Sequence, residues 1–203
     1  MKKTFFKGIG FGALTAALFT LMVFITISCE KEDPIIPEMT EVNPGDIYEG
    51  GIVVYVLGPG DPGYDPLVPH GLIYSEGDLE NQYGVSTFAW GTKGLLTNAI
   101  SPDSGYTNTI DIIAVESTGG TVSWYAAQMC DDYSVTVSGV TYNDWYLPSH
   151  NELSSMGLGY SVARWSSTEI QGSATQATVV PRLDFDHQKD KDNEYKVRAV
   201  RKF

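Results

Sequence analysis

Apolar runs separated by turn-forming segments predict several short strands in the first half of the folded region. Residues 50–57 (GGIVVYVL) are almost continuously apolar and open with two glycines, which is typical of a strand buried on both faces. Residues 71–74 (GLIY) predict a second short strand, and residues 88–91 (FAWG) form a third apolar patch. The segment 58–70 contains four prolines and three glycines, so we expect a loop there.

The middle of the chain has the spacing of two helices. One is predicted for residues 109–116, with Thr107 or Asn108 as its N-cap, and Gly119-Gly120 would separate it from the next. A second helix is predicted for roughly residues 121–132, because apolar residues recur there at near-helical intervals. These residues are Trp124, Ala127 and Cys130.

The clearest local signal lies at residues 144–153 (DWYLPSHNEL). Ser149 is a good N-cap and Glu152 follows three residues later, which predicts a capping box and a short helix ending near Gly157. Further along, residues 164–169 predict a strand edge or a turn, and residues 177–185 and 195–201 predict strands. In the last of these, apolar and basic residues alternate, so they are expected on opposite faces. The apolar members are Val197, Ala199 and Phe203, and the basic members are Arg198 and Lys202.

The amino terminus predicts an export signal. Residues 1–7 are basic, residues 8–28 carry no charge, and Cys29 follows directly. This order resembles a bacterial lipoprotein signal, so we expect residues 1–28 to be the signal peptide and Cys29 the site of lipid attachment. An uncleaved membrane anchor is the alternative, because 21 uncharged residues are enough to span a bilayer. Both interpretations place the domain outside the cytoplasm.

A short linker follows the anchor. Residues 29–44 contain three prolines and five acidic residues, a composition that favours an extended stalk. The Lys-Glu-Asp sequence at residues 31–33 resembles the surface-export signal of some Gram-negative lipoproteins. We therefore expect a protein lipid-anchored in the outer membrane and facing the cell exterior. The remaining residues, 45–203, are long enough for one domain with its own core.

Charge narrows the range of partners. The leader holds three of the 13 basic residues and none of the 25 acidic ones, so the mature chain has a net charge of −15. Nucleic acid binding is not expected, because it needs a basic surface. Docking on anionic lipid is disfavoured for the same reason. With Cys29 lipidated, Cys130 is the remaining thiol, and we expect it to be buried rather than reactive.

The motifs, taken in order, resemble the Lcl C-terminal domain family, a domain of unknown function common in bacterial surface and secreted proteins. They are Gly50–Tyr55, Trp90-Gly91, Asn108-Thr109, Ala126-Ala127 with Cys130, Asp144–Ser149 with Glu152-Leu153, Trp165–Glu169 and Val197–Arg201. The resemblance implies a C-type-lectin-like α+β fold, in which the first and last strands pair and a long loop region carries any ligand site. Some members are linked to adhesion and to sulfated polysaccharide. The acidity of this chain argues against a polyanionic ligand here.

Each candidate for chemistry has a structural alternative. Trp90, Trp145 and Trp165 could stack on sugars, but buried packing is the expected role of most tryptophans. Trp165 is the exception we single out, because hydroxyl side chains follow it. The predicted ligand-binding residues are Trp165, Ser167, Arg182, Asp184 and His187.

No cofactor or metal is expected. The acidic segment 184–194 could supply oxygen ligands for calcium, but its spacing is not that of an EF-hand loop, and a solvated acidic hairpin is the preferred interpretation. The three histidines, His70, His150 and His187, lack the spacing of a metal-binding pair.

These observations predict a non-enzymatic cell-surface module that binds glycan or another extracellular polymer, as in adhesion. The alternative is a structural or assembly component of the cell envelope whose partner is another surface protein. An enzyme is not expected, because the sequence shows no nucleophile motif and no pair of reactive cysteines.

Overall fold

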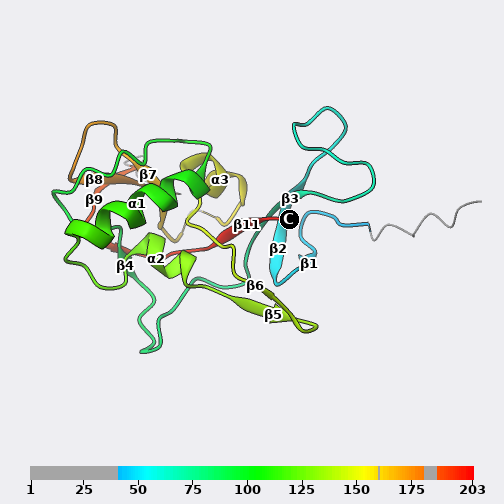
Figure 1. The fold of residues 1–203 in the computed structure, drawn as a ribbon, viewed down its shortest axis with the longest axis horizontal. Helices are drawn as coiled ribbons and strands as arrows, with labels where there is room; N and C mark the ends of the chain where they lie inside the picture. Colours follow the sequence, from blue (N-terminus) through cyan, green and yellow to red (C-terminus); the bar gives the residue numbers. More distant parts are fainter. Residues whose placement is uncertain (1–40, 160, 181–186) are drawn as a thin grey trace, which may run out of the picture. The chain divides into compact units, whose positions relative to one another are not determined.

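The computed structural model describes residues 41–159, 161–180 and 187–203, and all of them belong to one compact unit, Met39–Phe203. The unit is an α+β domain (Figure 1). One antiparallel sheet has the order β1-β2-β3-β11, and a second has the order β7-β8-β9. Their strands are β1 (Ile47–Tyr48), β2 (Gly51–Val56), β3 (Gly71–Ser75), β11 (Val200–Lys202), β7 (Arg164–Glu169), β8 (Gln176–Val180) and β9 (Gln188–Asp190).

Two small antiparallel pairs and three helices complete the described domain. The pairs are β4 (Phe88–Ala89) with β10 (Glu194–Tyr195), and β5 (Val135–Val137) with β6 (Val140–Tyr142). The helices are α1 (Gly105–Gly119), α2 (Ala126–Asp131) and α3 (His150–Ser155). The β5–β6 hairpin was not predicted from the sequence. Its turn residues Ser138 and Gly139 have φ values of 51° and 84°, which is typical of a type I′ turn.

The first and last strands share a sheet but do not pair with each other. β3 lies between β2 and β11, so the pairing implied by the family resemblance is wrong. Residue 71 is glycine for a steric reason, because a Cβ there would collide with the carbonyl oxygen of Tyr55 and the ring of Phe203. The close approach lets the backbone groups of Gly71 and Phe203 form hydrogen bonds in both directions, which extends the pairing of β3 with the end of the chain.

Helix positions were predicted better for α3 than for α1 and α2. The Ser149–Glu152 capping box is present, and Gly157, with φ of 62°, follows the end of α3. α1 begins earlier than predicted, with Ser104 rather than Thr107 or Asn108 as its cap. The side chain of Asn108 is instead buried, and it donates to the carbonyl oxygen of Ser101 and to the Ser167 hydroxyl. Ser104, the observed N-cap, lies before residues 109–116, the region that the sequence pattern assigned to this helix.

The C-terminal strands agree with expectation only in part. Residues 164–169 form a strand at the edge of the β7-β8-β9 sheet, which is one of the two predicted alternatives, with an irregular register between Trp165 and Glu169; all six residues are buried. The predicted strand 195–201 is interrupted between β10 and β11. Val197 and Ala199 are buried. Arg198 on the other face is also buried, because its guanidinium donates to the Asp78 carboxylate. The strand prediction for residues 181–185 falls outside the described residues.

Aromatic packing fills the core. Trp90, Trp145 and Trp165 are essentially inaccessible to solvent. The indole nitrogens of Trp90 and Trp165 donate to the backbone carbonyls of Ser166 and Phe88, both at 2.8 Å. Cys130 is buried in the same cluster, as predicted, and burial raises the pKa of its thiol, which disfavours the reactive thiolate.

Buried ion pairs fasten the strands to the loops. Asp78 accepts from Arg164 at 2.6 Å and from Arg198 at 3.0 Å, and both arginines are nearly inaccessible. Burial alone would raise the pKa of Asp78, but hydrogen bonding and the charge of the two guanidiniums hold it below its usual value. At the edge of the first sheet, Arg201 of β11 binds Asp144 and Glu49.

Candidate functional site

The structure removes two residues from the predicted ligand site. Trp165 is fully buried, and its ring stacks edge-on against Tyr195 at a centroid distance of 4.9 Å. Ser167 is also fully buried, with its backbone amide bonded to the carbonyl oxygen of Pro148. Neither side chain has a surface on which a sugar could lie, because β7 is covered on both faces.

The other predicted residues are only partly placed. Arg182 and Asp184 lie outside the described residues. His187 is half-buried, and its ring meets that of His150 edge-on at 5.8 Å. Burial, and then the neighbouring His187, lower the pKa of His150, and its Nδ1 is buried with no hydrogen-bond partner in the part of the chain that the structure describes. This pair was not predicted, because 37 residues separate its members in sequence.

The described part of the acidic segment 184–194 does not form a hairpin of its own. β9 pairs with β8, and β10 pairs with β4. Asp190 and Asp192 are exposed and form ion pairs with Lys93 at 2.8 and 3.2 Å. Across residues 41–159, 161–180 and 187–203, no group of three or more metal-ligating side chains comes together.

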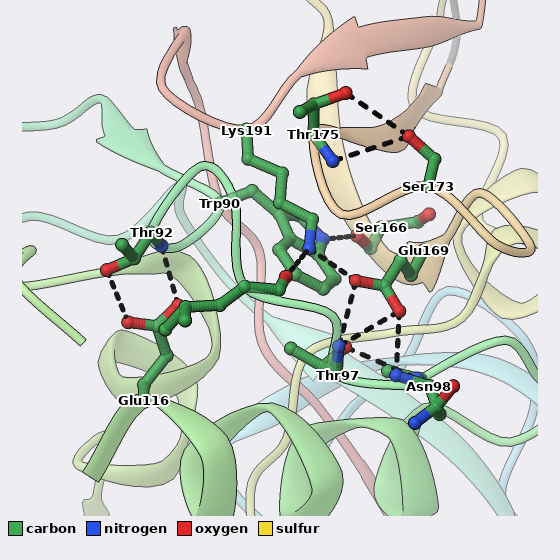
Figure 2. Close-up of polar contacts among 12 residues, drawn as sticks. Trp90, Thr92, Thr97, Asn98, Glu116, Ser166, Glu169, Ser173, Thr175 and Lys191 are labelled. Atoms are coloured by element: carbon green, nitrogen blue, oxygen red, sulfur yellow. Dashed lines mark hydrogen bonds and ion pairs between the residues drawn. The ribbon is translucent and has the colours of Figure 1, made fainter. Parts of the chain in front are cut away.

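A buried charged cluster around Lys191 and Glu169 stabilises the fold. Figure 2 shows the Lys191 ammonium on one side of the Glu169 carboxylate, with Thr97 and Asn98 on the other side. The ammonium pairs with Glu169, donates to the Leu95 carbonyl oxygen at 2.6 Å, and lies 4.5 Å from the centroid of the Trp90 ring. Both charged side chains are fully buried, so no solvent-borne ligand reaches them.

The most prominent accessible aromatic group is formed by Trp124 and Tyr83. Trp124 precedes α2, and its backbone has a φ of 57°, a left-handed conformation that is strained for a bulky residue. This conformation ends the predicted helix 121–132 on its N-terminal side, so α2 begins only at Ala126. The Trp124 side chain is 41% exposed and lies 5.3 Å, centroid to centroid, from the ring of Tyr83, which is 69% exposed.

The loop that presents Trp124 is anchored by a buried carboxylate. Glu116, near the end of α1, accepts from the backbone amide of Thr92 at 2.6 Å and from its hydroxyl at 2.8 Å (Figure 2). The Thr92 hydroxyl oxygen in turn accepts from the amide of Thr121 at 2.8 Å. A Cβ at Gly120 would collide with Glu116, so glycine is required at this helix end. The far end of the loop is held by Tyr125, which packs into the core.

Two hollows meet at Trp124. The larger, of about 650 Å³, lies between the C-terminal half of α1 and α2, and the smaller, of about 130 Å³, lies between Trp124 and the β4–β10 pair. Both are lined by Val122, Ser123 and Trp124. A third hollow of about 520 Å³ begins at Asp132, which also lines the larger one. We call the surface formed by these three hollows the Trp124 cleft.

The charged side chains that line the cleft are acidic. Among the described residues they are Asp78, Glu80, Glu116, Asp131, Asp132 and Glu194, of which Asp78 is paired with two arginines. Burial raises the pKa of Tyr125 to about 12, with contributions from Glu116, Asp131 and Asp132. Burial, and then Asp132, also raise the pKa of Asp131. A negative potential of this kind favours cations and opposes anions.

A polar group in the wall of the smaller hollow is unpaired. The Asn81 side-chain oxygen accepts from the amides of Tyr83 and Val85, but its Nδ2 is buried without a hydrogen-bond partner among the described residues. Asn81 thus shapes the loop that carries Tyr83, while the two N–H donors of its Nδ2 have no partner among the described residues. The cleft therefore combines an aromatic platform with hydroxyl and carboxylate acceptors, and the unpaired amide of Asn81 is buried in the wall of its smaller hollow.

No protein-family model matches the chain, and no curated protein matches it. Among the described residues, no helix has the length and apolar character needed to cross a membrane.

The Trp124 cleft was not predicted, because its two aromatic residues carry no local signal that they meet. Trp124 was assigned to the apolar face of a helix, and Tyr83 carried no motif. The two lie 41 residues apart and meet only through tertiary contacts. The polar Thr121 and Ser123 around Val122, directly after Gly119-Gly120, were a usable signal that the helix begins later.

Proposed function

We propose that this protein is a cell-surface lipoprotein whose domain binds glycan without catalysing a reaction, and that the Trp124 cleft is the binding site. The observation that carries the proposal is the exposed Trp124–Tyr83 pair at the junction of two hollows. Aromatic rings of this kind present a flat apolar face with a polar edge, which suits the C–H face of a sugar ring. Ser123, Gln128 and the carboxylates beside them supply hydrogen-bond partners for hydroxyl groups.

The backbone strain at Trp124 supports a binding role. A left-handed conformation at a bulky residue costs of order 1–3 kcal/mol and persists only where the surroundings enforce it. Here Glu116, Thr92 and Thr121 enforce it on one side and Tyr125 on the other. The result holds the indole partly in solvent, whereas burial would otherwise be favoured.

The finer parts of the proposal rest on sequence resemblance. The motifs shared with the Lcl C-terminal domain family support a C-type-lectin-like arrangement of the α+β domain. The lipoprotein-like leader supports lipid attachment at Cys29 and display on the outer face of the outer membrane. An acidic, proline-containing linker would carry the domain away from the membrane surface.

Glycan-array binding with residues 39–203 tests the function. We expect one glycan class to bind, and Trp124→Ala and Tyr83→Ala each to lower affinity about tenfold or more, as truncation of a central aromatic contact does. Tyr64→Ala is the matched control, because Tyr64 is similarly exposed but lies in the 58–70 loop, outside the cleft. Binding to no glycan, or equal loss in Tyr64→Ala, would contradict the proposal. A single dominant protein partner in cross-linking on intact cells would instead favour the envelope-assembly alternative.

A further inference from the structure

We infer that the Trp124 cleft selects glycans bearing free, protonated amino groups over N-acetylated or sulfated ones. This inference rests on the proposed glycan-binding function and adds the chemical class of the ligand.

The acids of the cleft differ in whether they are already engaged. Asp78 is neutralised by Arg164 and Arg198, and Glu116 is used to hold Thr92. Asp131 and Asp132 are exposed at the end of α2, and across the described residues no lysine or arginine forms an ion pair with either. Two neighbouring carboxylates are therefore available to a ligand.

The available acids lie beside the aromatic platform. Asp131 and Asp132 line the same hollow as Trp124, and Asp132 continues into the next hollow with Glu80. Glu194 lines the hollow on the other side of Trp124. Among the described residues that line the three hollows there is no lysine or arginine. A saccharide lying on the indole thus meets carboxylates on both sides and no basic side chain.

Sugar chemistry then decides the selectivity. A free amine on a sugar ring is a cation and a triple donor, which carboxylates bind through charge-assisted hydrogen bonds, and a nearby indole face adds a cation–π contribution. Acetylation removes the charge and leaves only neutral hydrogen bonding. A sulfate group would bring a negative charge against Asp131 and Asp132, in a mature chain whose net charge is already −15.

The test compares three oligosaccharide probes on residues 39–203 by calorimetry. The probes are a glucosamine oligomer, the N-acetylglucosamine oligomer of the same length, and a heparin oligomer, at a mildly acidic pH where the amines are protonated. We expect the glucosamine oligomer to bind about tenfold or more tighter than its acetylated counterpart, with no binding of heparin. The preference should weaken at high salt, because exposed charges are screened.

Variants separate the two contributions. Asp131→Asn with Asp132→Asn should abolish the preference for the free amine, because the side-chain amides still form hydrogen bonds but carry no charge, so affinity for the glucosamine oligomer should fall more than affinity for the acetylated one. Asp61→Asn with Asp65→Asn, in the loop 58–70, removes the same charge elsewhere and should preserve the preference. Trp124→Ala should weaken both oligomers, whereas an oligolysine control should bind weakly and independently of Trp124.

The possible results separate selectivity for free amines from glycan binding itself. Equal or tighter binding of the acetylated oligomer overturns the inference and leaves glycan binding intact. A preference that survives the Asp131 and Asp132 substitutions, or oligolysine binding as tight as that of the glucosamine oligomer, also overturns it. Binding of none of the three saccharides, together with an empty glycan array, overturns the proposed function and the inference with it.

Discussion

Breaking the buried Lys191–Glu169 ion pair should destabilise the domain more than any single exposed substitution. The Glu169 carboxylate accepts from Lys191 and from the amides of Thr97 and Asn98, at 3.0 and 2.7 Å. Glu169→Gln leaves the ammonium buried beneath Trp90 without a counter-ion. Lys191→Met fills the space with an apolar side chain of similar length but leaves a buried carboxylate.

The size of the expected loss in unfolding free energy follows from the complete burial of the Lys191 and Glu169 side chains. Removing one partner of a buried pair costs about 3–5 kcal/mol, because the remaining charge is uncompensated. The double variant Glu169→Gln/Lys191→Met removes both charges, and the new side-chain amide oxygen can still accept from Thr97 and Asn98. Its main loss is the donor to the Leu95 carbonyl oxygen, about 1–3 kcal/mol for an unsatisfied buried acceptor. The two substitutions should therefore be coupled by at least about 3 kcal/mol.

Urea unfolding of residues 39–203 and of the three variants measures these values. Thermal unfolding gives a second readout, since 1 kcal/mol corresponds to about 2–4 °C in a domain of this size. Each single variant should unfold roughly 6–20 °C lower than the parent, and the double variant should recover most of the loss. Single variants costing less than about 1 kcal/mol, or a double variant whose cost equals the sum of the singles, would refute the reasoning.

The ion pairs, the histidine pair and the leader each give a further prediction. Asp78→Asn should cost about 3 kcal/mol in urea unfolding, because two buried guanidiniums lose their carboxylate; an unchanged midpoint would contradict this. The folded state disfavours protonated His150, so stability should be complete above the unfolded pKa of about 6.5 and fall as pH drops toward the lower folded pKa. His150→Gln should flatten that dependence, and a parent-like pH profile in the variant would rule out His150 as its source. Mass spectrometry of the mature amino terminus should find acylated Cys29, and Cys29→Ala should release the protein from membranes; an intact leader would instead establish the uncleaved anchor.

Local sequence was sufficient for several structures that depend on near neighbours, although it missed the β5–β6 hairpin and the N-cap of α1. The Ser149–Glu152 capping box, the strand at Gly51–Val56 and the proline-rich loop after it were predicted, because caps, strand runs and turns are set by residues a few positions apart. The predicted burial of that strand on both faces is wrong, because Ile52, Val54 and Val56 are only partly buried and Tyr55 is exposed. The burial of Cys130 and of most tryptophans followed from their apolar character.

Tertiary structure decided everything that depends on distant partners. The same apolar character gave no way to distinguish Trp165, which is buried, from Trp124, which is exposed. Lys191 lies in a segment whose composition predicts a solvated hairpin. It is nevertheless buried, because it forms an ion pair with Glu169, 22 residues away in sequence. The Trp124 cleft exists because a glutamate on α1 fixes the loop before α2 against Thr92, and because the chain brings Tyr83 alongside. Contacts of this range have no signature in local spacing, since their free energy comes from burial and pairing formed only once the whole domain folds.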